Sequence, residues 1–259
     1  MNYSFMSFST PSLTLAEILD VALRYGYDGV EPRLDSNHAH GVEVVATASE
    51  REAARGLSLD RGIRIACLAT SVRFADPSSA KEMVRQTHER IDLAVDVGVP
   101  AIRVFGGRIP DGITREQSIE QVVRCLTEVA DHAAERGVTI CLETHDDWCD
   151  PVHVAAVLSR VNHPAVAANW DIMHPVIRAR ATIDSAFETL RPWIRHVHIH
   201  DGTAAGLAPI GTGEIDHRRA VELLRSVNYG GFLSGEWINW EPYEIHLPRE
   251  LAKMKSYEL

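Results

Sequence analysis

The sequence predicts an α/β fold, and more specifically a single (β/α)8 barrel. Short apolar runs alternate with longer amphipathic segments along the whole chain, eight of each. The 259 residues suit one barrel, since such barrels run to roughly 250 residues as one domain. No stretch rich in proline, glycine and serine interrupts the alternation. We therefore expect residues 1–259 to form one domain.

The expected strands are short and rich in apolar and β-branched residues. They are residues 3–8, 29–32, 63–70, 101–107, 139–145, 165–171, 194–201 and 231–237. A doubly wound open sheet is the structural alternative, and it would need a glycine-rich fingerprint after the first strand. The chain reads SFSTPSLT there, which favours the barrel.

The expected helices show apolar residues at spacings of three and four, and a glycine closes the pattern. Clear cases are residues 12–26, 118–137 and 218–230. A weak internal echo supports repetition of one unit, because RYGYDGVE near the start and SVNYGGFLSGE near the end share a helix, a tyrosine, a glycine, a strand and a glutamate.

Composition excludes several classes of function. The net charge of −10 argues against nucleic acid or a membrane surface as the main partner. The four cysteines show no CxxC spacing, and none of the three lysines follows an apolar strand, which argues against a Schiff-base enzyme. No leader pattern or apolar run of 18 residues is present, so we expect a cytoplasmic protein.

Polar side chains gather late in the last four expected strands, where a barrel places its active site. These strands end in LETH, NWD, HIHD and SGEW. Strand alternation points Glu143, Asp171 and Glu236 inward. Three carboxylates in a partly desolvated space need a counter-charge, and a divalent cation supplies one. Oxygen ligands with one imidazole suit Mn²⁺, Mg²⁺ or Co²⁺, with Zn²⁺ and Fe²⁺ as alternatives.

The motifs together resemble a known family. Glu143, D-x-x-H at 171–174, H-x-H-h-x-D-G at 196–202, GTGEID at 211–216 and Glu236 follow one another. This ordered set resembles the xylose isomerase-like barrel superfamily, in its branch of sugar phosphate isomerases and epimerases. That branch includes tagatose 3-epimerase-like enzymes, hydroxypyruvate isomerase and inosose dehydratase. The resemblance runs from the first strand to the eighth.

The resemblance implies a metal site and a mechanism. It implies that one divalent metal, with Mn²⁺ the first choice, is held by Glu143, Asp171, His198 and Glu236. It also implies that the two glutamates exchange protons with carbon on opposite faces of a hydroxy-ketone. A cation that polarises the carbonyl and stabilises the enediolate makes such proton removal feasible for a carboxylate.

The three histidines of HVHIHDG share one face of their strand, since side chains alternate. With His198 as the metal ligand, we expect His196 to lie deeper as a hydrogen-bonded core imidazole and His200 to touch substrate near the rim. The resemblance also implies that His174 contacts a substrate oxygen. In many relatives a lysine occupies the position of His200, and the tagatose 3-epimerase branch carries a nearby arginine that this chain lacks, so the substrate stays open.

Other residues have two interpretations each. His145 binds substrate or pairs with Asp146 or Asp147, and Arg103 binds substrate or neutralises Glu31. Trp148 and Trp237 follow two of the strands, where an aromatic face can stack on a sugar. For Glu143 and Glu236 the alternative is a salt bridge inside the barrel, and for Asp171 it is a helix cap. We expect the GTG turn to lead to Asp216 as a helix N-cap rather than to bind phosphate.

We therefore expect a metal-dependent isomerase or epimerase of a small keto-sugar or polyol-derived ketone, which removes an α-proton to give an enediolate. The close alternative is a lyase, either a dehydratase of a keto-inositol or keto-sugar or an enzyme of β-elimination from a keto-glycoside. An endonuclease IV-like phosphodiesterase and a non-catalytic ligand-binding barrel are further alternatives, and the negative charge argues against the first. A homo-oligomer is also expected.

Overall fold

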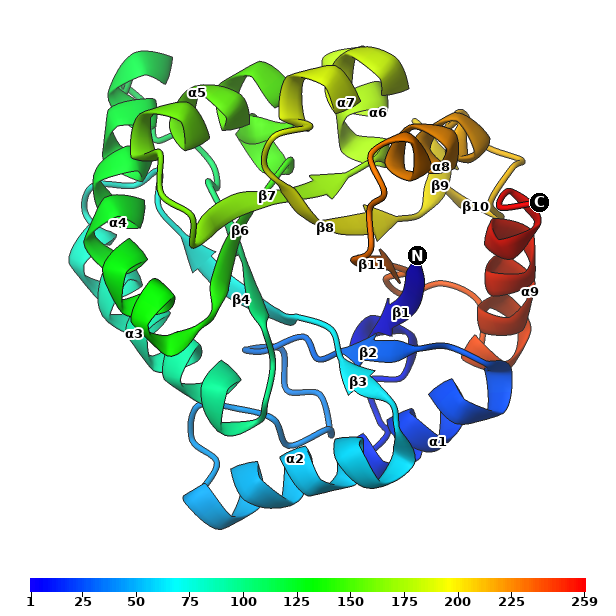
Figure 1. The fold of residues 1–259 in the computed structure, drawn as a ribbon. Helices are drawn as coiled ribbons and strands as arrows, with labels where there is room; N and C mark the ends of the chain where they lie inside the picture. Colours follow the sequence, from blue (N-terminus) through cyan, green and yellow to red (C-terminus); the bar gives the residue numbers. More distant parts are fainter.

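A computed structural model describes residues 1–259 and shows the predicted (β/α)8 barrel (Figure 1). Its strands are β1 (Asn2–Met6), β2 (Gly29–Glu31), β3 (Arg64–Ile65), β4 (Leu68–Arg73), β5 (Ala101–Phe105), β6 (Thr139–Glu143), β7 (Val166–Asp171), β8 (Ile194–Ile199) and β11 (Phe232–Gly235). They form one parallel sheet in the order β3-β2-β1-β11-β8-β7-β6-β5-β4. The sheet is nearly closed into a barrel.

The ends of the sheet meet because β3 and β4 are two parts of the third barrel strand. The amide of Ala66, between them, donates to the carbonyl of Val30, and Arg33 forms a parallel bridge with Ala69. The nine strands therefore count as eight around the barrel, in the expected places.

The helices are α1 (Leu15–Tyr25), α2 (Ala48–Arg61), α3 (Ala80–Asp96), α4 (Arg115–Arg136), α5 (Pro151–Val161), α6 (Met173–Ala179), α7 (Ile183–Leu190), α8 (His217–Ser226) and α9 (Tyr243–Ser256). Apart from α6, these helices surround the sheet (Figure 1). The sequence did not indicate α6, an extra short helix that follows β7. A hairpin of β9 (Asp201–Thr203) and β10 (Gly206–Ala208) follows β8.

The helices begin and end at local capping residues. Two of the three predicted closing glycines end their helices, whereas α8 ends at Ser226, before Gly230. Thr14 and Thr114 each accept a hydrogen bond from the amide three residues on, and each forms a capping box at the start of α1 and α4. Gly26 and Gly137 end these helices in the left-handed conformation that glycine adopts without strain. Local sequence thus fixes the length of the helices that frame the sheet.

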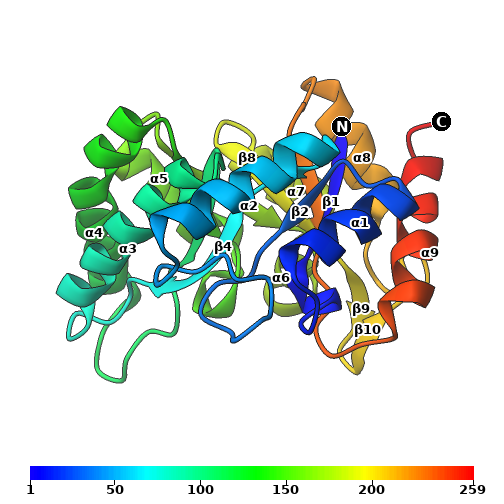
Figure 2. The same ribbon diagram turned by 90° about the horizontal axis from the view of Figure 1, so that it is seen from below.

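The core lies between the sheet and the helices, as a cluster of 63 buried apolar residues. A small second cluster fills the early part of four strands inside the barrel, and consists of Cys67, Ala101, Cys141 and Ala167. The late part of the same strands carries the polar side chains. Figure 2 shows that α6 and the β9–β10 hairpin lie at the end of the barrel opposite the N-terminus. None of the helices is both long enough and apolar enough to span a bilayer.

Candidate metal centre at the carboxyl end of the barrel

Four neighbouring strands bring three carboxylates and one imidazole to a single point. Glu143 ends β6, Asp171 ends β7, His198 lies in β8 and Glu236 directly follows β11. Each offers one ligand atom, and these four atoms lie within 4.8 Å of one another. All four residues are buried. Register explains the convergence, since Asp171 pairs with His198 and His198 pairs with Ser234, two residues before Glu236.

His198 stands between the carboxylates of the cluster. Its Nδ1 lies 2.5 Å from Oε1 of Glu143 and 3.5 Å from Oε2 of Glu236. The side-chain amide of Asn169 donates to the same oxygen of Glu143 at 3.0 Å. An imidazole nitrogen that close to a carboxylate oxygen needs either a proton or a cation to hold the two together.

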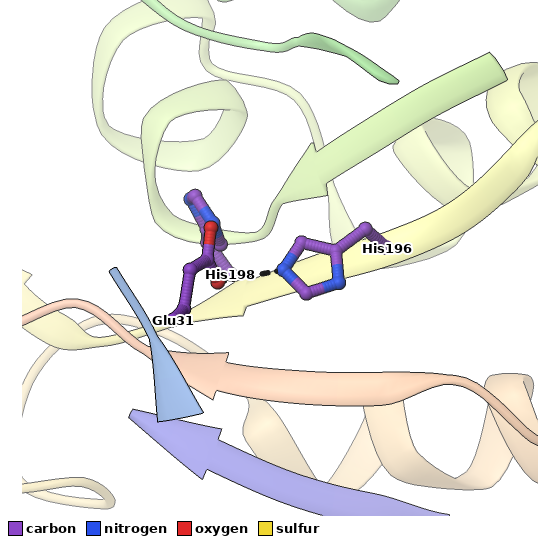
Figure 3. Close-up of side chains that lie close together, drawn as sticks. All are labelled: Glu31, His196 and His198. Atoms are coloured by element: carbon purple, nitrogen blue, oxygen red, sulfur yellow. Dashed lines mark hydrogen bonds and ion pairs between the residues drawn. The ribbon is translucent and has the colours of Figure 1, made fainter. Parts of the chain in front are cut away.

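The other nitrogen of His198 faces Glu31, a residue to which the sequence gave no role in the site. Nε2 of His198 lies 3.1 Å from Oε1 of Glu31, and Nε2 of His196 lies 2.8 Å from Oε2 (Figure 3). Figure 3 shows Glu31 on β2 reaching the two rings on β8. His196 is buried and hydrogen-bonded, as a core imidazole would be. The Glu31 carboxylate thus sets the orientation of both rings.

Arg103 does not neutralise Glu31, and that interpretation is wrong. Its Nε lies 3.3 Å from Oε2 of Glu143, and the side chains of both residues are 0% exposed. Glu31 instead uses its two oxygens on His196 and His198. The reason is that β5, which carries Arg103, pairs directly with β6, which carries Glu143.

The cluster fits a divalent cation on two grounds. Oε2 of Glu143 and Oε2 of Glu236 are buried and accept no hydrogen bond, which is costly unless another partner satisfies them. The donor set of three carboxylates and one imidazole is of the kind that binds hard or borderline divalent ions. The four residues therefore suit such an ion by both position and chemistry.

The charges of the cluster depend on one another. Burial alone would raise the pKa of Glu236, but the nearby His198 ring, 3.5 Å from its Oε2, outweighs burial and holds this pKa at about 2. Burial likewise opposes the charged form of His198, yet Glu31 and Glu143 raise the pKa of this imidazole well above its ordinary value. The carboxylates thus strongly favour positive charge at their centre.

Asp171 caps a helix, which is one of its two expected interpretations, and it also belongs to the carboxylate cluster. Its Oδ1 accepts the amides of Met173 and His174, both at 2.9 Å, and so caps the start of α6. Its Oδ2 lies 2.7 Å from Nε2 of His200. Burial raises the pKa of Asp171, but the charges of His200 and His174 lower it further than burial raises it. His200 therefore lies deeper than expected at the rim, because it is buried against Asp171.

A row of imidazoles leads from Asp171 toward the mouth. The ring centroids of His200 and His174 are 5.4 Å apart, and those of His174 and His145 are 4.4 Å apart. Nδ1 of His145 lies 2.9 Å from Oδ1 of Asp146, which matches one of its two expected interpretations. Burial opposes protonation of His145, but Asp146 and nearby carboxylates raise its pKa to about 9.

The two tryptophans proposed to stack on a sugar are buried, which corrects the expected open aromatic faces. Trp148 is 0% exposed, donates its indole N–H to the carbonyl of Gly107 and belongs to the apolar core. Trp237 is 1% exposed and packs against His246, with ring centroids 5.2 Å apart. The loops after β6 and β11 turn these large rings inward, which sequence parity does not reveal.

The GTG turn is occupied by a side chain of the protein itself. The carboxylate of Asp201 accepts the amides of Gly211, Gly213 and Ile215. Asp216 caps α8 by accepting the amide of Arg219 at 3.0 Å, as expected. With its amides used in this way, the turn has none left to cradle a phosphate.

Comparisons with known proteins show the family and the fold of the chain. The family described as the xylose isomerase-like TIM barrel matches residues 19–256. A 3-dehydroshikimate dehydratase of Bacillus anthracis is 22% identical, over 95% of this chain and 94% of that protein. A protein of Xenopus laevis named as a hydroxypyruvate isomerase is 25% identical over 63% of each chain. The crystal structure of a D-psicose 3-epimerase has a TM-score of 0.83 at 15% identity, and 99% of each chain is covered.

Proposed function

Because the chain belongs to the xylose isomerase-like TIM barrel family, we propose that it is a divalent-metal-dependent isomerase or epimerase of a small hydroxy-ketone. The observation that carries the proposal is the convergence of Glu143, Asp171, His198 and Glu236 at the carboxyl end of four neighbouring strands. These four residues would hold the metal, with Mn²⁺ the first choice. When bound, a divalent cation supplies polarisation of the substrate carbonyl and stabilisation of negative charge on its oxygen.

In this proposal, Glu143 and Glu236 are the residues that move protons. Their strands, β6 and β11, are separated in the sheet by β7 and β8, so the two carboxylates reach the centre from opposite sides of His198. Each keeps one buried oxygen without a hydrogen-bond partner. One glutamate removes the proton next to the carbonyl, which leaves an enediolate. In an isomerase the same glutamate returns that proton to the neighbouring carbon, whereas in an epimerase the other glutamate, which must first hold a proton, donates it to the opposite face.

Surrounding side chains hold the two glutamates in place. Asn169 donates to Oε1 of Glu143, and Arg103 lies beside its Oε2. An amide and a guanidinium group offer hydrogen-bond donors rather than a basic site, so neither side chain competes with Glu143 as a base. Burial of the cluster excludes bulk water, which protects an enediolate from stray protonation.

A dehydratase is the second candidate, and one observation favours it. His145, His174 and His200 form a row on the Asp171 side of the cluster, where one of them can protonate a departing β-hydroxyl. Loss of that hydroxyl from the same enediolate gives water and a new C=C bond. The match over nearly the whole chain to a 3-dehydroshikimate dehydratase supports this alternative.

Proton NMR in D₂O distinguishes the two reactions. The protein would be incubated with Mg²⁺, which does not broaden the spectra, and with ketohexoses, ketopentoses, hydroxypyruvate, keto-inositol or 3-dehydroshikimate. Solvent deuterium at the α-carbon of an isomeric product, lost in Glu236→Gln, is the expected result. A new olefinic signal without an isomer would assign the protein to the dehydratases. Absence of exchange with every compound would count against both.

A further inference from the structure

Two arginines flank the end of β4 at the barrel mouth. Arg33, just after β2, donates to the hydroxyl of Ser71 at 2.8 Å and to the carbonyl of Ala69 at 3.3 Å. Arg103, on β5, donates to the carbonyl of Thr70 at 2.8 Å. The backbone of one strand thus holds both guanidinium groups, one on each side, and restricts their side-chain freedom.

Arg103 keeps a buried donor that the protein does not use, whereas Arg33 keeps a charge that no carboxylate pairs with. Nη2 of Arg103 is buried and has no hydrogen-bond partner, in a residue that is 0% exposed. The guanidinium carbon lies 3.9 Å from the centroid of the Phe105 ring, which is half-buried at the mouth. Arg33 is half-buried and forms no ion pair, since Asp35 pairs with Arg90 instead. Unused donors on a fixed, buried arginine call for an acceptor.

The electrostatics indicate that this acceptor is an anion. Burial lowers the pKa of Arg33 to about 10, and the next largest contribution is repulsion from Arg103. Two guanidinium groups that repel each other in a partly desolvated mouth are stabilised by a negative charge between them. Arg presents a planar fork that matches a carboxylate bidentately.

We propose that Arg33 and Arg103 form a subsite for a carboxylate of the substrate, so that the enzyme acts on a hydroxy-keto acid rather than on a neutral sugar. The inference rests on the proposed function, because it names the substrate class of the same site. Arg103 touches Glu143, so the anionic group lies next to the reacting carbons. A singly charged carboxylate fits there better than a dianionic phosphate, because Glu143 and Glu236 are close.

Three ketones that share a hydroxymethyl ketone unit test the subsite. Hydroxypyruvate carries a carboxylate, dihydroxyacetone is neutral and dihydroxyacetone phosphate carries a phosphate. Their affinities for the Mg²⁺-loaded protein would be measured by calorimetry. Hydroxypyruvate is expected to bind at least roughly tenfold more tightly than the other two, as a charge-assisted bidentate contact provides. Equal affinities, or tightest binding of the phosphate, would overturn the proposal.

Substitutions test whether Arg33 produces the preference for hydroxypyruvate. Arg33→Gln should lower the preference for hydroxypyruvate over dihydroxyacetone roughly tenfold and leave dihydroxyacetone binding unchanged, whereas Arg33→Lys should retain part of it. Arg73→Gln is the matched control, because Arg73 ends β4, the strand that Arg33 and Arg103 contact, but is exposed. Equal weakening of both ligands in Arg33→Gln would show a structural role and refute the subsite. Selective binding without any deuterium exchange would instead refute the proposed function and keep the subsite.

Discussion

Glu31 accepts a hydrogen bond from Nε2 of His198 at 3.1 Å, and this contact leaves Nδ1 of the same ring to face Glu143 and Glu236. A carboxylate behind a metal-binding histidine fixes its tautomer and its orientation. Because Glu31 comes from β2, on the opposite side of the barrel from β6, the candidate centre depends on strands that are distant in the sheet.

Replacing Glu31 tests this relationship. Glu31→Gln is expected to weaken Mn²⁺ binding roughly 10- to 100-fold, because a neutral amide orients the imidazole less strongly. Electron paramagnetic resonance of free Mn²⁺ gives the affinity directly, without reference to activity. Glu214→Gln provides the control, since Glu214 is exposed on a loop after β8. An unchanged affinity in Glu31→Gln would mean that the ring needs no such support.

Removing a candidate ligand should abolish stabilisation by metal. At a free Mn²⁺ concentration of about 100 times the Kd, the folded protein gains about 2.7 kcal/mol, or roughly 5–10 °C in Tm for a chain of this size. Asp171→Asn should show little of this shift in Tm with Mn²⁺. Its Tm without Mn²⁺ should change less, because the amide oxygen of the asparagine can still cap α6. Thermal unfolding with and without Mn²⁺ measures both. A full shift in the variant would remove Asp171 from the ligand set.

His40 should make the fold sensitive to acid. Its Nδ1 accepts the amide of Val42 and its Nε2 faces the carbonyl of Arg33, an arrangement that requires a neutral ring. Burial lowers its pKa to about 4. As the pH falls from about 6.5 to about 4, His40 takes up a proton in the unfolded chain but not in the folded chain. The free energy of unfolding therefore decreases by about 3 kcal/mol over this range. Urea unfolding of wild type and His40→Gln from pH 7.5 to 4.5 should show a larger loss in the wild type, with His40 as the cause of the difference. Parallel pH profiles would contradict it.

Gly106 should tolerate no side chain, because an added Cβ would lie 2.3 Å from Nε1 of Trp148. Gly106→Ala is expected to lower the free energy of unfolding by about 1–3 kcal/mol, a typical cost of overpacking. Gly56→Ala, in α2 with nothing within 4 Å, should instead raise it by about 0.5–1 kcal/mol. Equal stabilities for the two variants would show that Trp148 moves freely.

The sequence predicted the barrel and where to look for the site, because strand and helix periods are local properties. Glu143, Asp171, His198 and Glu236 converge as expected, since the carboxyl ends of parallel strands meet at one end of a barrel. The extra helix α6 follows from the Asp171 cap, which appears in the sequence only as one member of D-x-x-H.

Contacts between side chains that lie far apart in the sequence were harder to predict. One of the two interpretations of Arg103, neutralisation of Glu31, was wrong, because only the register of β5 with β6 places Arg103 beside Glu143. The sequence did contain a signal for Glu31. The similarity between GVE (29–31) and SGE (234–236) gives Glu31 the position in its segment that Glu236 has in the other. The burial of Trp148 depends on how a loop turns, which period alone does not determine.

The metal centre is tested most directly by the stoichiometry of Mn²⁺ binding. It would be measured by electron paramagnetic resonance on metal-free wild type and on Glu236→Gln. We expect one tightly bound Mn²⁺ per chain in the wild type and a large loss of affinity in the variant, with both proteins folded by circular dichroism. Binding of no Mn²⁺ at micromolar protein, or equal binding by wild type and variant, would contradict the metal centre on which the proposed chemistry depends.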